Sequence, residues 1–297
     1  MIQRKGVFSF LIITFGITYL VEGTAIALGF RSEIIPSIAW QFIVLAMMWV
    51  PSLATVLTCK LVTGESLRHT TGLRFGPWKY YLITWLVVPA AFAVIYGLTW
   101  LFGLSQPDWQ LTELFNLASS YGATMDTAPS PTLIIVGLSV GSVFAAVWFN
   151  SLVAFGEEWG WRGYLLPRLM PLGKWKAYTL MGIIWGLWHA PLIAVGFNYG
   201  SYNLLGIIFF CGVTFAFGIF VNEFSLKAKS SILAAWIHGV FNSQGYGVWR
   251  QLFPVYNPLL GGLTGLVGIM VWLVIGLVTM KWLTRQSETK STLPAAG

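Results

Sequence analysis

The stretch TLIIVGLSVGSVFAAVWFNSLVAFG (132–156) carries no charged side chain, and the run EEWGWR (157–162) follows it directly. A helix needs about 20 apolar residues to cross the hydrocarbon core of a membrane, so this stretch predicts a transmembrane helix that ends at two glutamates. The whole chain has the same character, since 57% of its residues are hydrophobic, 9% are charged and its mean hydropathy is +0.74. Soluble domains contain about 25% charged residues. The sequence therefore predicts an all-α fold, a polytopic transmembrane helical bundle.

Further apolar segments of similar length give about eight spans in a single membrane domain, residues 1–297. We expect the spans near 8–29, 38–62, 80–104, 132–156, 177–197, 204–222, 230–249 and 259–283. The longest polar connection, 105–131, contains no Lys or Arg, and a short polar tail occupies 286–297. No internal repeat or second domain is evident.

The basic residues predict the orientation of these spans. Of the 17 Lys and Arg, all but Arg31 and Arg250 fall on the side of the membrane that holds the N-terminus in this arrangement. Short cytoplasmic loops are enriched in Lys and Arg, so both termini are expected in the cytoplasm. We expect an integral multi-pass protein of a bacterial or archaeal plasma membrane. The net charge of +7 is then explained by orientation, with no nucleic acid as partner.

The first apolar segment has a second interpretation. Arg4, Lys5 and the small residues of Ala25-Ile26-Ala27 resemble a cleavable signal peptide. Glu22 and the length of the apolar run argue against cleavage. The other seven spans would keep their orientation in either case.

Ionisable groups are rare in this chain, and a small set of them lies on neighbouring apolar segments. Charged groups in hydrocarbon cost several kcal/mol and usually have a function. Arg162 follows Glu158 by four residues, a spacing that brings two side chains together on one face of a helix. Glu157 lacks that spacing, so we expect Glu158 to be paired and Glu157 to be free to act as a general base.

Two histidines follow on later spans. At 1.5 Å per residue, His189 lies about 18 Å and His238 about 12 Å from the cytoplasmic ends of their predicted helices. Asn242 shares a helix face with His238 because it follows four residues later. Taken singly, these groups could form an interfacial ion pair or hydrogen bonds between helices. Their joint occurrence favours a polar site in the cytoplasmic half of the membrane.

The motifs EEWGWR (157–162), WGLWH (185–189) and HGVFN (238–242) resemble, in order and spacing, those of the CPBP intramembrane proteases. This family includes the type II CAAX prenyl endopeptidases and the bacterial Abi proteins. The resemblance covers about residues 130–250, which would form the catalytic core. Trp185 departs from the family pattern, which usually has Phe at this position.

The resemblance implies an intramembrane peptidase in which Glu157 and His189 activate a water molecule. His238 and Asn242 would stabilise the oxyanion, while Glu158 and Arg162 would support these residues. No cofactor is required in this interpretation, which we favour. The alternative is a zinc-dependent metalloprotease of the same fold, in which Glu157, His189 and His238 bind Zn²⁺ and leave a position for water.

Other functions remain compatible with the sequence. The same buried polar groups could serve a membrane transporter or proton-coupled carrier, although no inverted repeat is present. An immunity protein of this fold that has lost its activity is a third interpretation. The expected partners are membrane lipid and a peptide or protein substrate. Prenylation of the substrate and the oligomeric state stay open.

Overall fold

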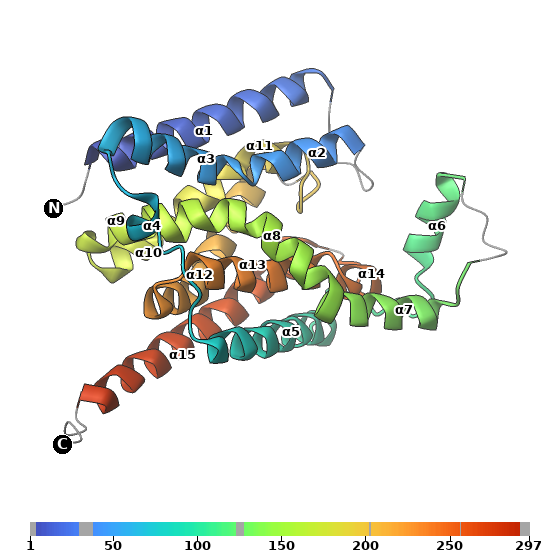
Figure 1. The fold of residues 1–297 in the computed structure, drawn as a ribbon. Helices are drawn as coiled ribbons and strands as arrows, with labels where there is room; N and C mark the ends of the chain where they lie inside the picture. The colour runs from blue at the N-terminus through green and yellow to red at the C-terminus, as the bar shows by residue number, and fades with distance from the viewer. Residues whose placement is uncertain (1–3, 30–37, 123–127, 202, 256, 292–297) are drawn as a thin grey trace.

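The computed structural model describes residues 4–29, 38–122, 128–201, 203–255 and 257–291. These residues form helices joined by short connections, with one isolated β-bridge between Ser105 and Val255 and no strand. The helices are α1 (Arg4–Ala27), α2 (Ile38–Met47), α3 (Val50–Leu57), η1 (Thr58–Thr63), α4 (Leu67–Thr70), α5 (Trp78–Leu101), α6 (Thr112–Ser120), α7 (Pro131–Val140), η2 (Gly141–Ala145), α8 (Ala146–Glu158), η3 (Trp159–Leu165), α9 (Leu166–Leu169), η4 (Met170–Leu172), α10 (Lys174–Trp188), α11 (Ala190–Ala194), α12 (Asn203–Ala228), α13 (Ser231–Gly245), α14 (Val248–Leu252) and α15 (Leu266–Ser291). Figure 1 shows their arrangement.

Six helical stretches of the described chain are long and apolar enough to cross a membrane. They are Arg4–Ala27, Ala39–Thr63, Trp78–Leu101, Pro131–Leu172, Leu204–Ala228 and Leu266–Gln286. Large apolar side chains such as Trp148 and Leu204 are exposed on the outside of the bundle, as expected for contact with lipid. The all-α multi-pass bundle is therefore confirmed.

The two other predicted spans are shorter than expected. Helices α10 and α13 each contain 15 residues, which corresponds to about 22 Å at 1.5 Å per residue. The hydrocarbon core of a membrane is about 30 Å thick, so neither helix crosses it alone. These two helices carry the candidate histidines.

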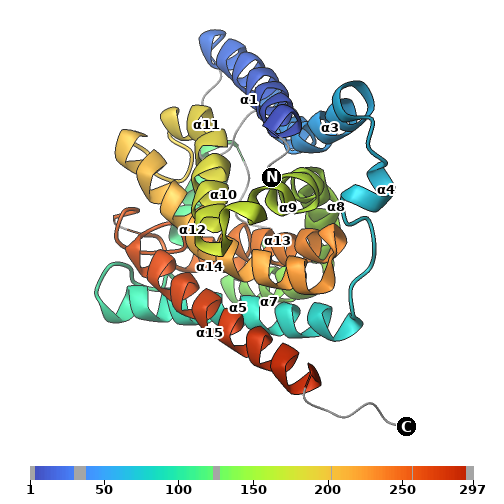
Figure 2. The same ribbon diagram turned by 90° about the vertical axis from the view of Figure 1, so that its left-hand side faces the viewer.

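Helix α13 lies inside the bundle, where it packs on α8, α5 and α12. Helix α12 in turn contacts α10 and α15, and α1 contacts α3. Figure 2 shows α1 and α3 on one side of this assembly and α5 and α15 on the opposite side. The candidate site therefore lies among the helices in the middle of the molecule.

The fourth predicted span does not end at residue 156. The helix continues through the π-helical segment η3 and through α9 to Leu172, so Glu157 and Glu158 lie within a long helical stretch. Three side chains of this continuation, Trp161, Tyr164 and Leu165, are fully buried. The segment is covered by protein, and its burial explains why the helix continues beyond the charged residues.

The fifth predicted span is interrupted at the candidate histidine. Helix α10 ends at Trp188, His189 is its C-terminal cap, and α11 begins at Ala190. Pro191 lacks a backbone N–H and cannot continue the hydrogen-bonding pattern of α10.

At the C-terminal end of the chain, α15 extends to Ser291 and includes the start of the predicted tail. Arg31 and residues 292–297 lie outside the described residues.

Candidate active site

The two adjacent glutamates end helix α8 and are both buried, with exposed fractions of 2% for Glu157 and 0% for Glu158. Arg162, one turn further on, donates a hydrogen bond from Nη1 to Oε1 of Glu158 at 2.8 Å. The predicted ion pair between these residues is confirmed. Nε of Arg162 also donates to Oδ1 of Asn222 on α12 at 3.0 Å. These contacts fix the guanidinium between two helices.

His238 joins the same cluster from α13. Its Nδ1 lies 2.9 Å from Oε1 of Glu158, the oxygen that also accepts from Arg162. Because an ionised carboxylate only accepts hydrogen bonds, Nδ1 is the donor. Nε2 of His238 is left for another partner. Glu158 therefore connects α8 to both α13 and η3.

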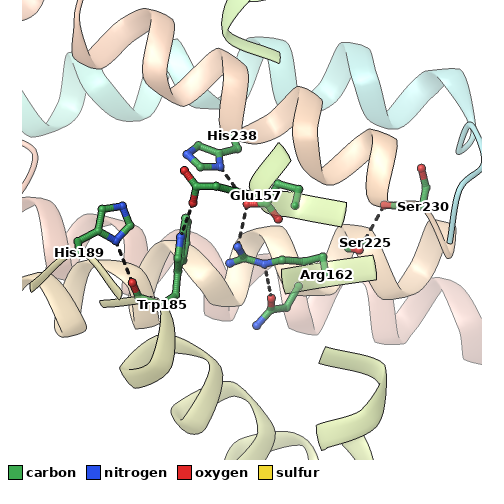
Figure 3. Close-up of polar contacts among 9 residues, drawn as sticks. Glu157, Arg162, Trp185, His189, Ser225, Ser230 and His238 are labelled. Carbon is green, nitrogen blue, oxygen red and sulfur yellow. Dashed lines mark hydrogen bonds and ion pairs between the residues drawn. The ribbon is translucent and has the colours of Figure 1, made fainter. Parts of the chain in front are cut away.

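Glu157 has a different partner, the indole of Trp185 on α10. Nε1 of Trp185 donates to Oε2 of Glu157 at 2.8 Å (Figure 3). The Trp185 ring also packs against the guanidinium of Arg162, whose Cζ is 4.1 Å from the ring centroid, and against the His238 ring at 5.3 Å. The indole is thus in contact with three of the site residues.

His189 lies at the break between α10 and α11, and its side chain is half-buried. Its Nδ1 is 2.8 Å from the carbonyl oxygen of Trp185, which can only accept, so Nδ1 carries the proton. The rings of Trp188 and Phe210 each lie 4.7 Å from the imidazole between ring centroids. In the neutral form, Nε2 of His189 is a hydrogen-bond acceptor.

Asn242 lies one turn after His238 on α13, and its side chain is half-buried. Among the described residues its amide group makes no hydrogen bond to protein, whereas its backbone carbonyl accepts from Tyr246. The amide is therefore available to a ligand, although within the described chain no hydrogen bond ties it to the other site residues.

The structure brings together the residues of three predicted motifs from α8, α10 and α13. The sequence did not reveal Asn222, which anchors Arg162, or the hydrogen bond from Trp185 to Glu157. Asn222 lies in the apolar α12 span next to Glu223, and the sequence feature that marks it is a polar amide within an apolar span.

The zinc candidates do not fit a metal site in this arrangement. Within the described ranges, no three or more His, Cys, Asp or Glu side chains are grouped so that they could hold a metal ion. The mechanism proposed below therefore has no step through a metal.

Comparison with known proteins finds similarity to CAAX-type peptidases. Residues 132–244 match the family model described as type II CAAX prenyl endopeptidase Rce1-like. The chain is also similar to CAAX prenyl protease 2 of Methanococcus maripaludis, with 27% identity over 233 residues, which cover 75% of this chain and 77% of the relative. The matched region contains α8, α10 and α13 with all the residues of the site. These two similarities support the CPBP family for this chain and indicate that the protein is a peptidase.

Proposed function

We propose that this protein hydrolyses a peptide bond within the membrane by means of a water molecule that Glu157 activates. His189 orients this water, and His238 and Asn242 stabilise the oxyanion. The observation that carries the proposal is the different environment of the two glutamates. Glu158 accepts from Arg162 and His238, whereas Glu157 accepts from the neutral indole of Trp185 and makes no ion pair with Arg162 among the described residues.

The first step is attack on the substrate carbonyl. A water molecule donates one hydrogen to a carboxylate oxygen of Glu157 and the other to Nε2 of His189. Glu157 takes a proton as the water oxygen forms its bond to the carbonyl carbon, which gives a tetrahedral intermediate with a negatively charged oxygen. His189 suits this role because its proton is on Nδ1, held by the Trp185 carbonyl.

The oxyanion is stabilised from α13. Asn242 donates from its amide, and His238 donates from Nε2 when its imidazole is protonated. Glu158, 2.9 Å from Nδ1, stabilises that positive charge. The cluster of Glu157, Glu158, Arg162 and protonated His238 is then neutral before the reaction begins. Such donors act where charge develops and typically provide the largest single contribution to the rate.

The second step breaks the carbon–nitrogen bond. The intermediate collapses to a carboxylic acid, and the protonated Glu157 gives its proton to the leaving amine. Glu157 is thereby returned to the carboxylate form for the next cycle. The same residue acts first as base and then as acid, as microscopic reversibility allows.

We propose a prenylated peptide as the substrate class. The support is the description of the family model and the name of the relative, CAAX prenyl protease 2. A peptide with an isoprenoid on cysteine would be cleaved faster than the same peptide without it, because the lipid group partitions into the membrane around the site. Equal rates for the two peptides would contradict this assignment and leave the hydrolytic mechanism standing.

Glu157→Gln tests the base directly. The variant keeps the shape and the bond to Trp185 but cannot accept a proton, so we expect kcat to fall by about 10²–10⁴-fold. Cleavage of a prenylated CAAX peptide is measured with protein purified in detergent. The matched control is Glu223→Gln on α12, another buried glutamate, which pairs with Lys174 outside the site. Wild-type cleavage by a folded Glu157→Gln protein would refute the assignment.

A further inference from the structure

A cavity of about 650 Å³ lies beside the candidate active site. Segments far apart in the sequence line it, namely α4 with the loop that follows, η3 with α9, the end of α12 and the start of α13. Figure 3 shows two of its lining residues, Ser225 and Ser230, on the opposite side of Arg162 from Trp185. The cavity is thus separated from Glu157 by the ion pair of Arg162.

The cavity is strongly basic. Arg68, Arg74, Arg162 and Lys229 line it, and none of its lining residues is acidic. Arg162 is neutralised by Glu158, but Arg68, Arg74 and Lys229 are exposed and make no ion pair in the part of the chain that the structure describes. Three like charges around one cavity repel one another, and an anion between them would remove that repulsion.

Hydrogen bonds between the two walls fix the shape of this cavity. Ser231, the first residue of α13, donates from its backbone N and from Oγ to the carbonyl oxygen of Gly72, at 3.0 and 3.1 Å. Oγ of Ser230 donates to the carbonyl of Arg74. The loop that carries Arg74 is therefore tied to the start of α13. That helix has 15 residues, and its N-terminus adds partial positive charge to the same wall.

The ends of candidate spans around the cavity would place it at the level of a membrane surface. The candidate span Ala39–Thr63 ends near it, the span Trp78–Leu101 begins near it, and α12 ends at Ala228, next to Lys229. Phe75 follows Arg74 directly and Trp78 lies three residues further on; they are 77% and 76% exposed. Aromatic residues concentrate at the membrane–water interface, which is also where the phosphates of lipids lie.

We propose that this cavity binds the phosphate of an anionic phospholipid headgroup, with Arg68, Arg74 and Lys229 as the groups that pair with it. Arginine forms paired hydrogen bonds with phosphate, and basic pockets between transmembrane helices bind anionic headgroups. The acyl chains would lie along the apolar surface beside Phe75 and Trp78. This binding site is independent of the peptidase mechanism, since none of its three basic groups contacts Glu157, His189 or His238 in the described structure.

Native mass spectrometry of the full-length protein in neutral detergent tests the proposal. Phosphatidylglycerol and phosphatidylcholine with the same acyl chains are added in equal amounts. We expect retention of phosphatidylglycerol to exceed that of phosphatidylcholine by at least about tenfold. The triple variant Arg68→Gln, Arg74→Gln, Lys229→Gln should lose this preference. The control triple variant Lys60→Gln, Lys176→Gln, Lys281→Gln removes three exposed charges outside the cavity and should keep it.

The outcomes separate the alternatives. Equal loss of lipid in both triple variants, or loss in neither, would overturn the cavity as the binding site. Displacement of phosphatidylglycerol by millimolar inorganic phosphate would indicate a site for free phosphate and would overturn the lipid assignment. Melting curves in detergent check that the variants fold. If the triple variant does not fold, the single change Arg74→Glu repeats the test and should also abolish the preference.

Discussion

Glu157 and Glu158 are adjacent and chemically identical, but their neighbours give them different hydrogen bonds. Glu158 receives a guanidinium and an imidazole on the same oxygen, while Glu157 receives one indole N–H. The carboxylate of Glu158 thus ties two other site residues together through charge-assisted hydrogen bonds, and Glu157 has no such partner among the described residues. The division of roles that we propose for the two glutamates rests on these neighbours.

Trp185→Phe tests whether the indole N–H positions Glu157. Hydrogen bonds to charged groups contribute about 1.5–3 kcal/mol, so kcat should fall by at least about tenfold with little change in KM. Trp188→Phe is the matched control, since Trp188 is equally buried and its Nε1 donates to Thr18 over the same 2.8 Å. Both variants should lower the melting temperature, but only Trp185→Phe should lower kcat. Equal effects on kcat would assign Trp185 a packing role alone.

The zinc content of the purified protein tests whether His189 and His238 act without a metal. Under the mechanism proposed here, chelators should leave peptidase activity unchanged, and purified protein should contain less than one zinc per chain by elemental analysis. His189→Ala and His238→Ala would then lower activity without changing the metal content. One tightly bound zinc per chain, removed by both substitutions together with the activity, would replace this mechanism by the zinc-dependent one.

At the scale of helices, local contacts are predictable from the sequence and distant ones are not. The four-residue spacing of Glu158 and Arg162 is enough to predict their ion pair, because both lie on one helix. The bonds from Trp185 to Glu157, from Arg162 to Asn222 and from His238 to Glu158 join residues 28, 60 and 80 positions apart. These depend on how the helices pack, which spacing along the chain does not determine.

The boundaries of the helices show the same limit. Apolar runs identify the spans, but hydropathy does not show that a span continues past charged residues when protein covers them, as α8 does through η3 and α9. Nor does it locate the break at His189, although Pro191 is a local indication of one. That break matters for function because it places His189 at a helix end, beside the rings of Trp188 and Phe210.

The packing of α13 on α8 depends on a glycine. A Cβ at Gly239 would lie 2.5 Å from Cα of Ser151 on α8, closer than real contacts allow. Gly239→Ala should therefore force the helices apart and destabilise the protein by about 1–3 kcal/mol, with loss of activity because His238 is adjacent. Gly245→Ala on the same helix is the control, since its nearest neighbour would be 3.4 Å away. Melting temperatures in detergent compare the two, and equal stability would contradict the close-packing argument.

At the scale of the whole molecule, the arrangement explains why a polar site can exist in an apolar chain. Helices α8, α10, α12 and α13 place Glu157, Glu158, Arg162 and His238 inside the bundle, where each is at most 5% exposed. Many large apolar side chains are exposed on the outer surfaces of the bundle, as expected for contact with lipid. Ionised groups are thus removed from hydrocarbon and satisfied by one another, which lowers the cost of placing them within the membrane.

The orientation of this bundle in the membrane is the last prediction. The distribution of Lys and Arg places both termini and α4 in the cytoplasm and α6, in the 105–131 connection, outside. Single cysteines replace Ser66, at the start of α4, or Ser119 in α6, both exposed, after Cys59 and Cys211 have been removed. An impermeant maleimide should label position 119 in intact cells and position 66 only after permeabilisation. The opposite pattern would invert the bundle and would put the basic cavity and the nearby peptidase site at the outer surface.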